Sequence, residues 1–391
     1  LPEAVAVALV VVLLSLHDIG KFAARFQSLL AAVADWLGAP KTNKPYSVYH
    51  DTLSLHFWDQ VIFPALWSED WISLRGPCSV RLDGGDYFRA LMKPIAGHHG
   101  RPPRPNQLKK AGAEITEESR RAAKSYAREA FNLHFPSFPE EWSPSQIEAA
   151  RRASWTLAGL AVVADWIGSD ESHFSRRSEP MPLTRYWERR AKPQARRAVE
   201  ATGLLGASPS RETGIQSLFP GYTPTPAQVC ASDLPIQEGP ELFVIEDATG
   251  SGKTESATVL AHREMAAGYT HGVYYGLPTM ATANAMYDRI SDDYQRLFTA
   301  PKEASVVLAH SARDLSKTFQ KSVRMGAGKK TVARTYDQAG NDRPGEAQCA
   351  AWLADNRKKA LLGQVGVGTI DQALLGTLPS NHQSLRLMGV A

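Results

Sequence analysis

The chain of 391 residues shows two different hydrophobic patterns, one in each half. In the first half, apolar side chains recur at helical spacing at Phe22, Phe26 and Leu29, and again over residues 155–167. A basic segment, residues 183–202, has the length of a further helix. The pattern therefore predicts a mostly helical region that extends from residue 1 to about residue 205.

In the second half, the apolar residues form short continuous runs instead of recurring at helical spacing. Apolar runs at residues 242–245, 272–277 and 304–308 alternate with helical stretches. Short runs separated by helices are typical of βαβ units and a parallel sheet, so we predict an α/β domain over residues 223–391. Residues 206–222 are rich in Ser, Pro and Gly, and we predict that they form a linker after the helical region, residues 1–205.

The composition is that of a globular protein, with 43% hydrophobic and 21% charged residues. A net charge of +4 permits nucleic-acid binding without indicating it, so any basic surface must be local. Cys78, Cys230 and Cys349 are far apart, which argues against a disulfide framework or a zinc ribbon. A reducing, cytoplasmic location is therefore expected.

An apolar run over residues 4–16 leads directly into His17 and Asp18. It is shorter than the ~18 residues that span a bilayer, and it lacks a basic leader. We therefore expect no membrane segment. We interpret the run as a buried helix that delivers the two polar residues to a site.

Residues suited to metal ligation are spread over the helical region. They are the pair His17-Asp18, His50, the glycine-bounded pair His98-His99, and Asp165. Imidazole and carboxylate ligands together favour Mn, Fe, Co, Ni or Zn over Mg. Asp18 can bridge two such ions, and two ions ~3.5–4 Å apart can activate water and stabilise the oxygens of a phosphodiester. Lys21 lies one turn after His17 and is expected to neutralise a phosphate oxygen.

Local sequence leaves some of these ligands undecided. His56 lies near His50 and offers the same imidazole. Asp165 lies in Val-Ala-Asp-Trp-Ile-Gly, which is nearly repeated around Asp35 as Val-Ala-Asp-Trp-Leu-Gly. The histidine pair at residues 98–99 can also be interpreted as a polar turn. The residues alone do not separate these alternatives.

A glycine-rich loop follows the apolar run at residues 242–245. It consists of Ala248, Thr249, Gly250, Ser251, Gly252, Lys253 and Thr254. The N–H groups of such a loop wrap phosphates, and the following helix adds its positive end. Lys253 is expected to reach the β- and γ-phosphates and Thr254 to hold Mg²⁺. Upstream, Gln228 ends the segment Tyr-Thr-Pro-Thr-Pro-Ala-Gln and is expected to read an adenine edge, so ATP with Mg²⁺ is the predicted nucleotide.

Assembled in this way, the chain resembles the CRISPR-associated HD nuclease–helicases of type I interference systems over essentially its whole length. That family has the ligand order His, His-Asp, His, His-His, Asp. The residues that match are His17-Asp18, His50, His98-His99 and Asp165. The order favours Asp165 over Asp35, and the segment Tyr-His-Asp-Thr-Leu-Ser favours His50 over His56. The resemblance implies an all-α HD-type metal-dependent phosphohydrolase domain, followed by an incomplete α/β RecA-like P-loop helicase domain.

Two further segments carry the resemblance into the second half. Residues 277–286, Leu-Pro-Thr-Met-Ala-Thr-Ala-Asn-Ala-Met, resemble the family's motif Ia. Residues 367–374, Val-Gly-Thr-Ile-Asp-Gln-Ala-Leu, resemble its next strand-contacting motif. By resemblance, Thr279 and Thr369 hold the backbone of single-stranded DNA, a contact that does not depend on base sequence.

The resemblance also implies a function. Asp18 and Lys21 act in a two-metal nuclease site that nicks single-stranded DNA, and ATP drives further degradation of invader DNA. A monomeric enzyme is recruited by an RNA-guided surveillance complex that holds an R-loop. Guide pairing supplies the choice of sequence, so the nuclease needs none of its own.

Two departures from the family pattern stand beside this match. The family's first His has no counterpart before His17, because the chain begins at Leu1. The acidic Walker B motif and the second RecA-like domain have no counterpart either. We therefore expect a fragment with one weakened metal position and poor ATP hydrolysis. The alternatives are an HD phosphohydrolase that acts on nucleotides and a non-catalytic chain that docks on DNA or on the surveillance complex.

Overall fold

The computed structural model divides the chain into two compact units. The described residues are 3–29, 34–35, 38, 46–69, 71, 91–134, 148–149, 151–175, 180–300, 304–313, 316–324, 349–355 and 357–389. One unit combines Leu1–Gln194 with Pro379–Met388, and the other combines Ala195–Leu378 with Gly389–Ala391. The first unit is therefore not contiguous in sequence.

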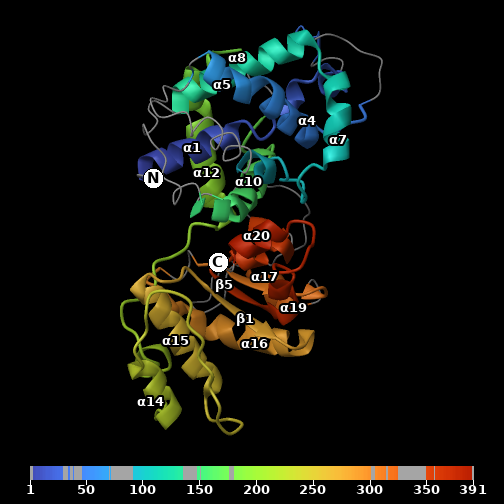
Figure 1. The fold of residues 1–391 in the computed structure, drawn as a ribbon. Coiled ribbons are helices and arrows are strands. Elements are labelled where there is room, and N and C mark those ends of the chain that lie inside the picture. Colours follow the sequence, from blue (N-terminus) through green and yellow to red (C-terminus); the bar gives the residue numbers. More distant parts are fainter. Residues whose placement is uncertain are drawn as a thin grey trace, which may run out of the picture. The chain divides into compact units, whose positions relative to one another are not determined.

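The described elements of the first unit are helical, as its hydrophobic pattern predicts (Figure 1). They are α1 (Glu3–Ser15), η1 (Ile19–Phe22), α2 (Ala24–Gln27), α4 (His50–Phe57), η2 (Trp58–Ile62), α5 (Phe63–Ser68), α7 (Pro105–Ala111), η3 (Gly112–Glu114), α8 (Glu117–His134), α10 (Ser154–Gly168), α11 (Leu183–Tyr186), η4 (Trp187–Ala191) and α20 (Gln383–Met388). Helix α12 (Lys192–Thr202) begins in this unit and continues into the second. The helix predicted over residues 155–167 is confirmed as α10, and the basic segment at residues 183–202 is helical throughout.

One face of helix α1 packs into the core of this unit, whereas Val7 is exposed, so the helix is less completely buried than its apolar sequence predicts. Leu9, Val12, Leu13 and Leu16 are buried among aromatic and aliphatic side chains of α4, η2 and α8. By length and composition alone, the helical stretch Glu3–Phe22 would pass as a membrane span, a test that apolar core helices also pass. Because α1 packs in this way, the residues that follow its last turn lie at the site described below.

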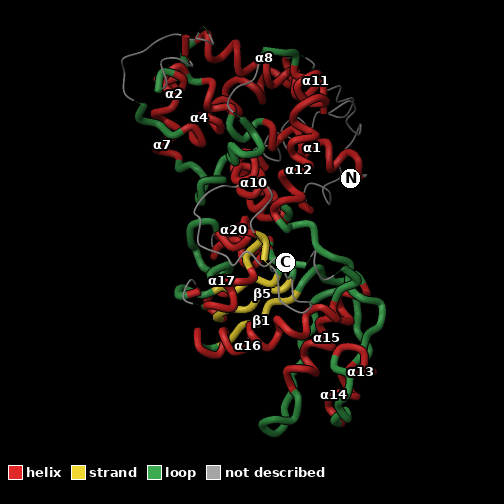
Figure 2. The backbone as a smooth tube through the Cα atoms, turned by 180° about the vertical axis from the view of Figure 1, so that it is seen from behind, coloured by secondary structure: helices red, strands yellow, loops and turns green. Residues whose placement is uncertain are grey.

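The second unit contains a three-stranded parallel sheet, drawn in yellow in Figure 2. Its order is β1 (Val273–Leu277), β5 (Val365–Thr369), β2 (Val306–Ala309), with Leu277 beside Thr369 at the carboxyl end. The other elements are α13 (Ile215–Leu218), α14 (Pro226–Asp233), α15 (Lys253–Ala267), α16 (Met280–Asp293), η5 (Tyr294–Leu297), α17 (Lys317–Ser322), β3 (Val323–Arg324), β4 (Cys349–Ala350), α18 (Ala351–Asp355), η7 (Arg357–Leu362) and α19 (Ile370–Leu374). The predicted parallel sheet is thus confirmed, and two of the three predicted strands are β1 and β2.

The third predicted strand, at residues 242–245, is not formed. Phe243 and Ile245 face the core, but Leu242 and Val244 are 89% and 74% exposed. No described strand pairs with this segment. Burial alternates along this segment as it does in a strand, but a strand also requires a hydrogen-bonded neighbour.

The predicted linker, residues 206–222, also differs from the structure. Ala207, Ile215, Leu218 and Phe219 are buried in the core of the second unit. A hydrogen bond fixes the backbone near Ala207, because the N–H of Ser210 donates to the carbonyl of Leu297. Ser, Pro and Gly here produce turns that pack on the domain rather than a free connection.

Candidate metal centre and nucleotide loop

His17 and Asp18 follow α1 at the turn that leads into η1. The Nδ1 atom of His17 lies 2.7 Å from the carbonyl oxygen of Leu14, and the Nδ1 atom of His98 lies 3.1 Å from that of Ile95. A ring nitrogen that donates to a carbonyl fixes the tautomer and leaves the lone pair on Nε2. Both imidazoles are therefore oriented with Nε2 as the free ligand atom.

Asp18 lies among three of these rings. Its Oδ1 atom is 3.3 Å from Nε2 of His50 and 3.4 Å from Nε2 of His98, and its Oδ2 atom is 3.5 Å from Nε2 of His17. His50 is the first residue of α4, and His98 lies in the turn before Gly100. One carboxylate thus faces imidazoles from three separate segments, as a bridging ligand would.

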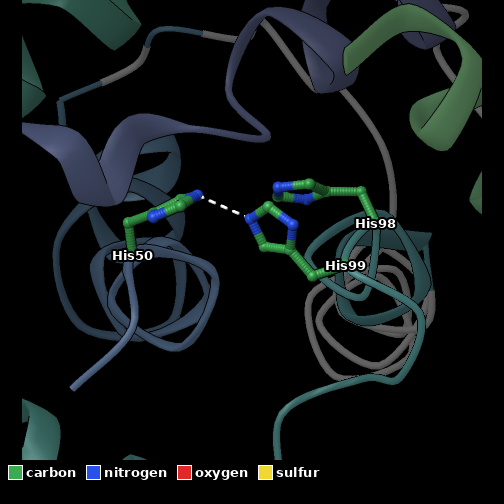
Figure 3. Close-up of side chains that lie close together, drawn as sticks. All are labelled: His50, His98 and His99. Atoms are coloured by element: carbon green, nitrogen blue, oxygen red, sulfur yellow. Dashed lines mark hydrogen bonds between the residues drawn. The ribbon is translucent and has the colours of Figure 1, made fainter. Parts of the chain in front are cut away.

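The described residues contain two groups whose ligand atoms all lie within 4.8 Å of one another. These are His17, His98 and Asp165, and His50, His98 and His99. His98 is common to both, and Nε2 of His99 lies 2.8 Å from Nε2 of His50 (Figure 3). Asp165, on α10, places Oδ1 3.8 Å from Nε2 of His17. The six predicted ligands are therefore brought together.

The competing residues lie elsewhere. Asp35 is exposed, and no described group of possible ligands includes it. His56 belongs to α4 but lies beside Gly112, away from the groups above. Asp165 and His50 thus lie with the other candidate ligands, and Asp35 and His56 do not, a distinction that local sequence alone did not give.

Three buried polar atoms at the centre make no hydrogen bond: Oδ1 of Asp18, Nε2 of His17 and Nε2 of His98. Burial of such atoms without a partner is costly, and their geometry as three convergent acceptors suits a cation. Two or three imidazole nitrogens with a carboxylate form a donor set for a divalent transition metal. The residues present therefore fit a metal centre.

The charges at the site favour the ligating forms of these groups. Burial opposes ionisation of Asp18, but the neighbouring His98 ring and the charges of His17 and Lys21 lower its pKa. Burial lowers the pKa of His50 to about 4, so this ring is neutral at pH 7. Burial and the charge of His98 also lower the pKa of His99. His17 is the exception: burial lowers its pKa, but the carboxylates of Asp165 and Asp18 outweigh this effect and raise the pKa, so this ring must lose any proton before it binds a metal.

Lys21 and Tyr46 complete the surroundings. The ammonium of Lys21 pairs with Oδ2 of Asp18, and its side chain is 42% exposed. The Tyr46 hydroxyl lies 3.4 Å from Nδ1 of His50, and burial raises the pKa of this tyrosine to about 12. Sequence reasoning missed Tyr46, because a tyrosine four residues before a histidine carries no signal without the fold.

The nucleotide loop has the backbone that a phosphate cradle needs. Gly250 and Gly252 have φ values of +85° and +86°, a region that L side chains rarely adopt. Helix α15 begins at Lys253, whose Nζ atom donates to the carbonyls of Asp247 and Ala248 at 2.7 Å each. The lysine thus lies across its own loop, where a phosphate would replace the carbonyls as partner.

The side chain of Gln228 is hydrogen-bonded to this loop. Its Oε1 atom accepts from the backbone N–H of Thr225 at 3.0 Å, and its Nε2 atom donates to the carbonyl of Gly252 at 3.4 Å. A β-carbon on Gly252 would lie 2.0 Å from that Nε2 atom, so only glycine fits. The predicted adenine contact stays a prediction, and the observed role of Gln228 is to hold the loop.

Thr279 lies two residues after the end of β1, and Thr369 is the last residue of the neighbouring strand β5. Thr279 caps α16, and its exposed hydroxyl accepts from the N–H of Thr282 at 3.2 Å. Thr369 ends β5 and is buried, with 8% of its surface exposed. The edge of the sheet is where α/β domains present ligand-binding loops, but only Thr279 offers an accessible hydroxyl there.

The fold and site together define a class: an HD-type metal-dependent phosphohydrolase domain of helices, followed by part of a RecA-like domain that carries a P-loop. Residues 1–174 match the family described as "Cas3, HD domain". In an alignment of 396 positions that covers 96% of the chain, it is 30% identical to the CRISPR-associated endonuclease/helicase Cas3 of Escherichia coli (strain K12). Residues 1–174 thus carry a match to the Cas3 HD domain, and nearly the whole chain is similar to a CRISPR-associated HD nuclease–helicase.

Solved structures agree with this assignment of fold. A crystal structure of T. fusca Cas3 with AMPPNP covers all of the chain with a TM-score of 0.72 at 24% identity. A CRISPR RNA-guided surveillance complex in a pre-nicking state contains a chain that matches 98% of the residues, with a TM-score of 0.54 at 21% identity. The chain spans 42% of the length of the E. coli relative, and 40% and 36% of the two structures.

Proposed function

We propose that this chain is the metal-dependent nuclease part of a CRISPR interference enzyme, and that it cuts single-stranded DNA. The observation that carries the proposal is Asp18, whose carboxylate faces Nε2 atoms of His17, His50 and His98 at 3.3–3.5 Å. Two of those nitrogens, with one carboxylate oxygen, are buried and make no hydrogen bond. Such a constellation has no purpose in a protein that only docks on DNA.

The residues divide the work between them. His17, His98 and Asp165 would hold one divalent ion, and His50 and His99 would contribute to a second, because the single free Nε2 atom of His98 can serve only one ion. Asp18 faces rings of both groups and would be the carboxylate available to both ions. When bound, Mn, Fe, Co or Ni would supply Lewis-acid stabilisation of the phosphodiester oxygens and acidify water. The ammonium of Lys21 is placed beside Asp18 to contact a phosphate oxygen once the strand displaces its present pairing.

ATP with Mg²⁺ is the proposed ligand of the second site. Support comes from Gly250 and Gly252 in left-handed conformations, with Lys253 and Thr254 at the start of α15. A related Cas3 binds AMPPNP according to the name of its structure. Association with an RNA-guided surveillance complex is proposed on the same footing, from the pre-nicking complex described above. Strand unwinding by the longer enzyme is proposed from the family alone.

The test is a nicking assay on circular single-stranded DNA in Mn²⁺, Ni²⁺ or Mg²⁺. Asp18→Ala removes the carboxylate that faces all three rings, so we expect cleavage to fall by at least about 100-fold. Asp35→Ala, an exposed aspartate in a nearly identical local sequence to Asp165, is the control and should cleave normally. Full activity of Asp18→Ala would refute the site, and release of phosphate from dNTPs instead of DNA nicking would favour a nucleotide phosphohydrolase.

A further inference from the structure

Residues 379–388 take no part in the chemistry proposed above. This segment follows the second unit in sequence but packs in the first. Its helix α20 lies against α10, the helix that carries Asp165. The approach is close at Gly159, where a β-carbon would lie 2.8 Å from the carbonyl oxygen of Ser384 and 2.9 Å from Cβ of Met388. Only glycine permits this contact.

The residue before α20, His382, contacts two other parts of the site. Its backbone N–H donates to the carbonyl of Gly100 at 3.3 Å, and its ring centroid lies 5.4 Å from that of Trp166. Gly100 directly follows His99, and Trp166 directly follows Asp165. One residue therefore contacts the neighbour of a candidate ligand on each of two segments.

Backbone conformation shows that this contact is specific. His382 is the one non-glycine residue with positive φ among the described residues, at +56°. Such a conformation is uncommon for histidine and persists where the surroundings hold it. Gly100 has φ of +113°, and a β-carbon there would lie 3.2 Å from the His382 nitrogen. Both partners are thus conformationally unusual at the point where they meet.

Because Asp165 lies on α10, contacts along this helix also determine the direction of its carboxylate. Gly159 and Trp166 are seven residues apart, so they lie on one face of α10, two turns from each other. A helix held at two points along one face cannot rotate about its axis. Asp165 lies about 100° around from Trp166, so its carboxylate keeps a fixed direction toward His17. Metal sites need ligands held to within about 0.5 Å, and such rotation would exceed this tolerance.

We infer that residues 379–388 position the metal centre, with His382 as a positioning residue that holds the Asp165 helix and the His98-His99 turn in register. The inference rests on the proposed function, because it presupposes that these residues bind metal. If α20 only packed on α10 and did not position the metal ligands, a different result would be expected. It would lower the stability of the fold but leave the metal affinity of the folded protein unchanged.

The test uses the full chain with three substitutions. His382→Asn removes the ring that contacts Trp166 while keeping a residue that tolerates left-handed φ. Gly159→Ala forces α20 away from α10. Gly168→Ala is the matched control on the same helix, because a β-carbon there meets nothing within 4 Å. Mn²⁺ affinity is measured by calorimetry, and the Mn²⁺ concentration for half-maximal nicking is measured beside the rate at saturating Mn²⁺.

We expect His382→Asn and Gly159→Ala to weaken Mn²⁺ binding about tenfold, as removal of an outer-shell partner does, and to regain most of the native rate at saturating Mn²⁺. Gly168→Ala should bind Mn²⁺ as the native chain does. Native Mn²⁺ affinity in folded His382→Asn and Gly159→Ala would overturn the inference, as would an equal loss in Gly168→Ala. Asp18→Ala separates the two levels: if it too binds Mn²⁺ normally, the proposed metal centre itself is wrong.

Discussion

The proposed metal centre draws its candidate ligands from segments between residues 17 and 165, whereas the proposed nucleotide loop takes its phosphate-binding groups from seven consecutive residues, 248–254. At the first site, Oδ1 of Asp18 and the Nε2 atoms of His17 and His98 are buried. The Nδ1 atom of each of these two histidines faces a backbone carbonyl, which holds the ring in one orientation. At the second, Lys253 donates to its own loop, and the preceding segment pairs with no described strand.

This difference teaches where each site obtains its precision. A site assembled from distant residues depends on the packing of the whole unit, so remote contacts such as those of α20 matter to it. A local loop carries its geometry in two glycines with positive φ and in the support of Gln228. The first kind of site should be sensitive to the fold, and the second to a few consecutive residues.

The sharpest test of this contrast compares Asp165→Ala with Asp35→Ala. Both aspartates follow Val-Ala and precede Trp, so local sequence predicts the same effect for both. Only Asp165 lies at the metal centre, so we expect its loss to reduce nicking by about 100-fold or more and Asp35→Ala to change nothing. Metal content by mass spectrometry should fall from about two ions to about one only in Asp165→Ala. Equal effects of the two substitutions would contradict a site defined by tertiary position.

A smaller effect is expected at the nucleotide loop. Lys253→Ala removes a charge-assisted hydrogen bond to phosphate, worth roughly 1.5–3 kcal/mol, so ATP affinity should fall about 10- to 100-fold. Fluorescent-nucleotide titration measures this. Lys317→Ala, an exposed lysine that also begins a helix, is the control. Metal-dependent nicking without ATP should be unchanged, and its loss would mean that the two sites are not independent.

The smallest effect concerns stability of the second unit at acid pH. His262 is buried on α15, and its Nε2 atom lies 3.1 Å from the carbonyl of Leu297. Burial lowers its pKa, although the hydrogen bond to Leu297 opposes the shift. Because the pKa of His262 is lower in the folded chain than in the unfolded chain, neutral His262 favours folding above the unfolded pKa of about 6.5. As the pH falls below this value, the free energy of unfolding decreases by at most about 1.4 kcal/mol per pH unit.

Hydrogen exchange of α15 between pH 7.5 and pH 5 reports this loss locally. His262→Gln keeps a donor for Leu297 but does not titrate, so its exchange protection should vary less with pH. His271→Gln, at an exposed histidine, should keep the native dependence. Identical pH profiles for all three proteins would rule out His262 as the cause.

Much of the fold and site could be predicted, and each failure has a physical reason. The ligand types and the two domain classes follow from residue chemistry and periodicity. Asp165 and Asp35 could not be separated locally, because ligation depends on where α10 lies. The strand expected at residues 242–245 failed because strand formation needs a non-local partner. The role of residues 379–388 left no signal, because nothing in that segment resembles a metal ligand site.

The return of residues 379–388 to the first unit has a consequence for biosynthesis. Domains usually fold as they leave the ribosome, the amino-terminal one first. Here the α10 surface stays uncovered while residues 195–378 are made, an interval on the order of ten to forty seconds at 5–20 residues per second. The first unit therefore reaches its finished form only after residues 195–378 have been translated, so the proposed metal centre is completed later than the proposed nucleotide loop is synthesised.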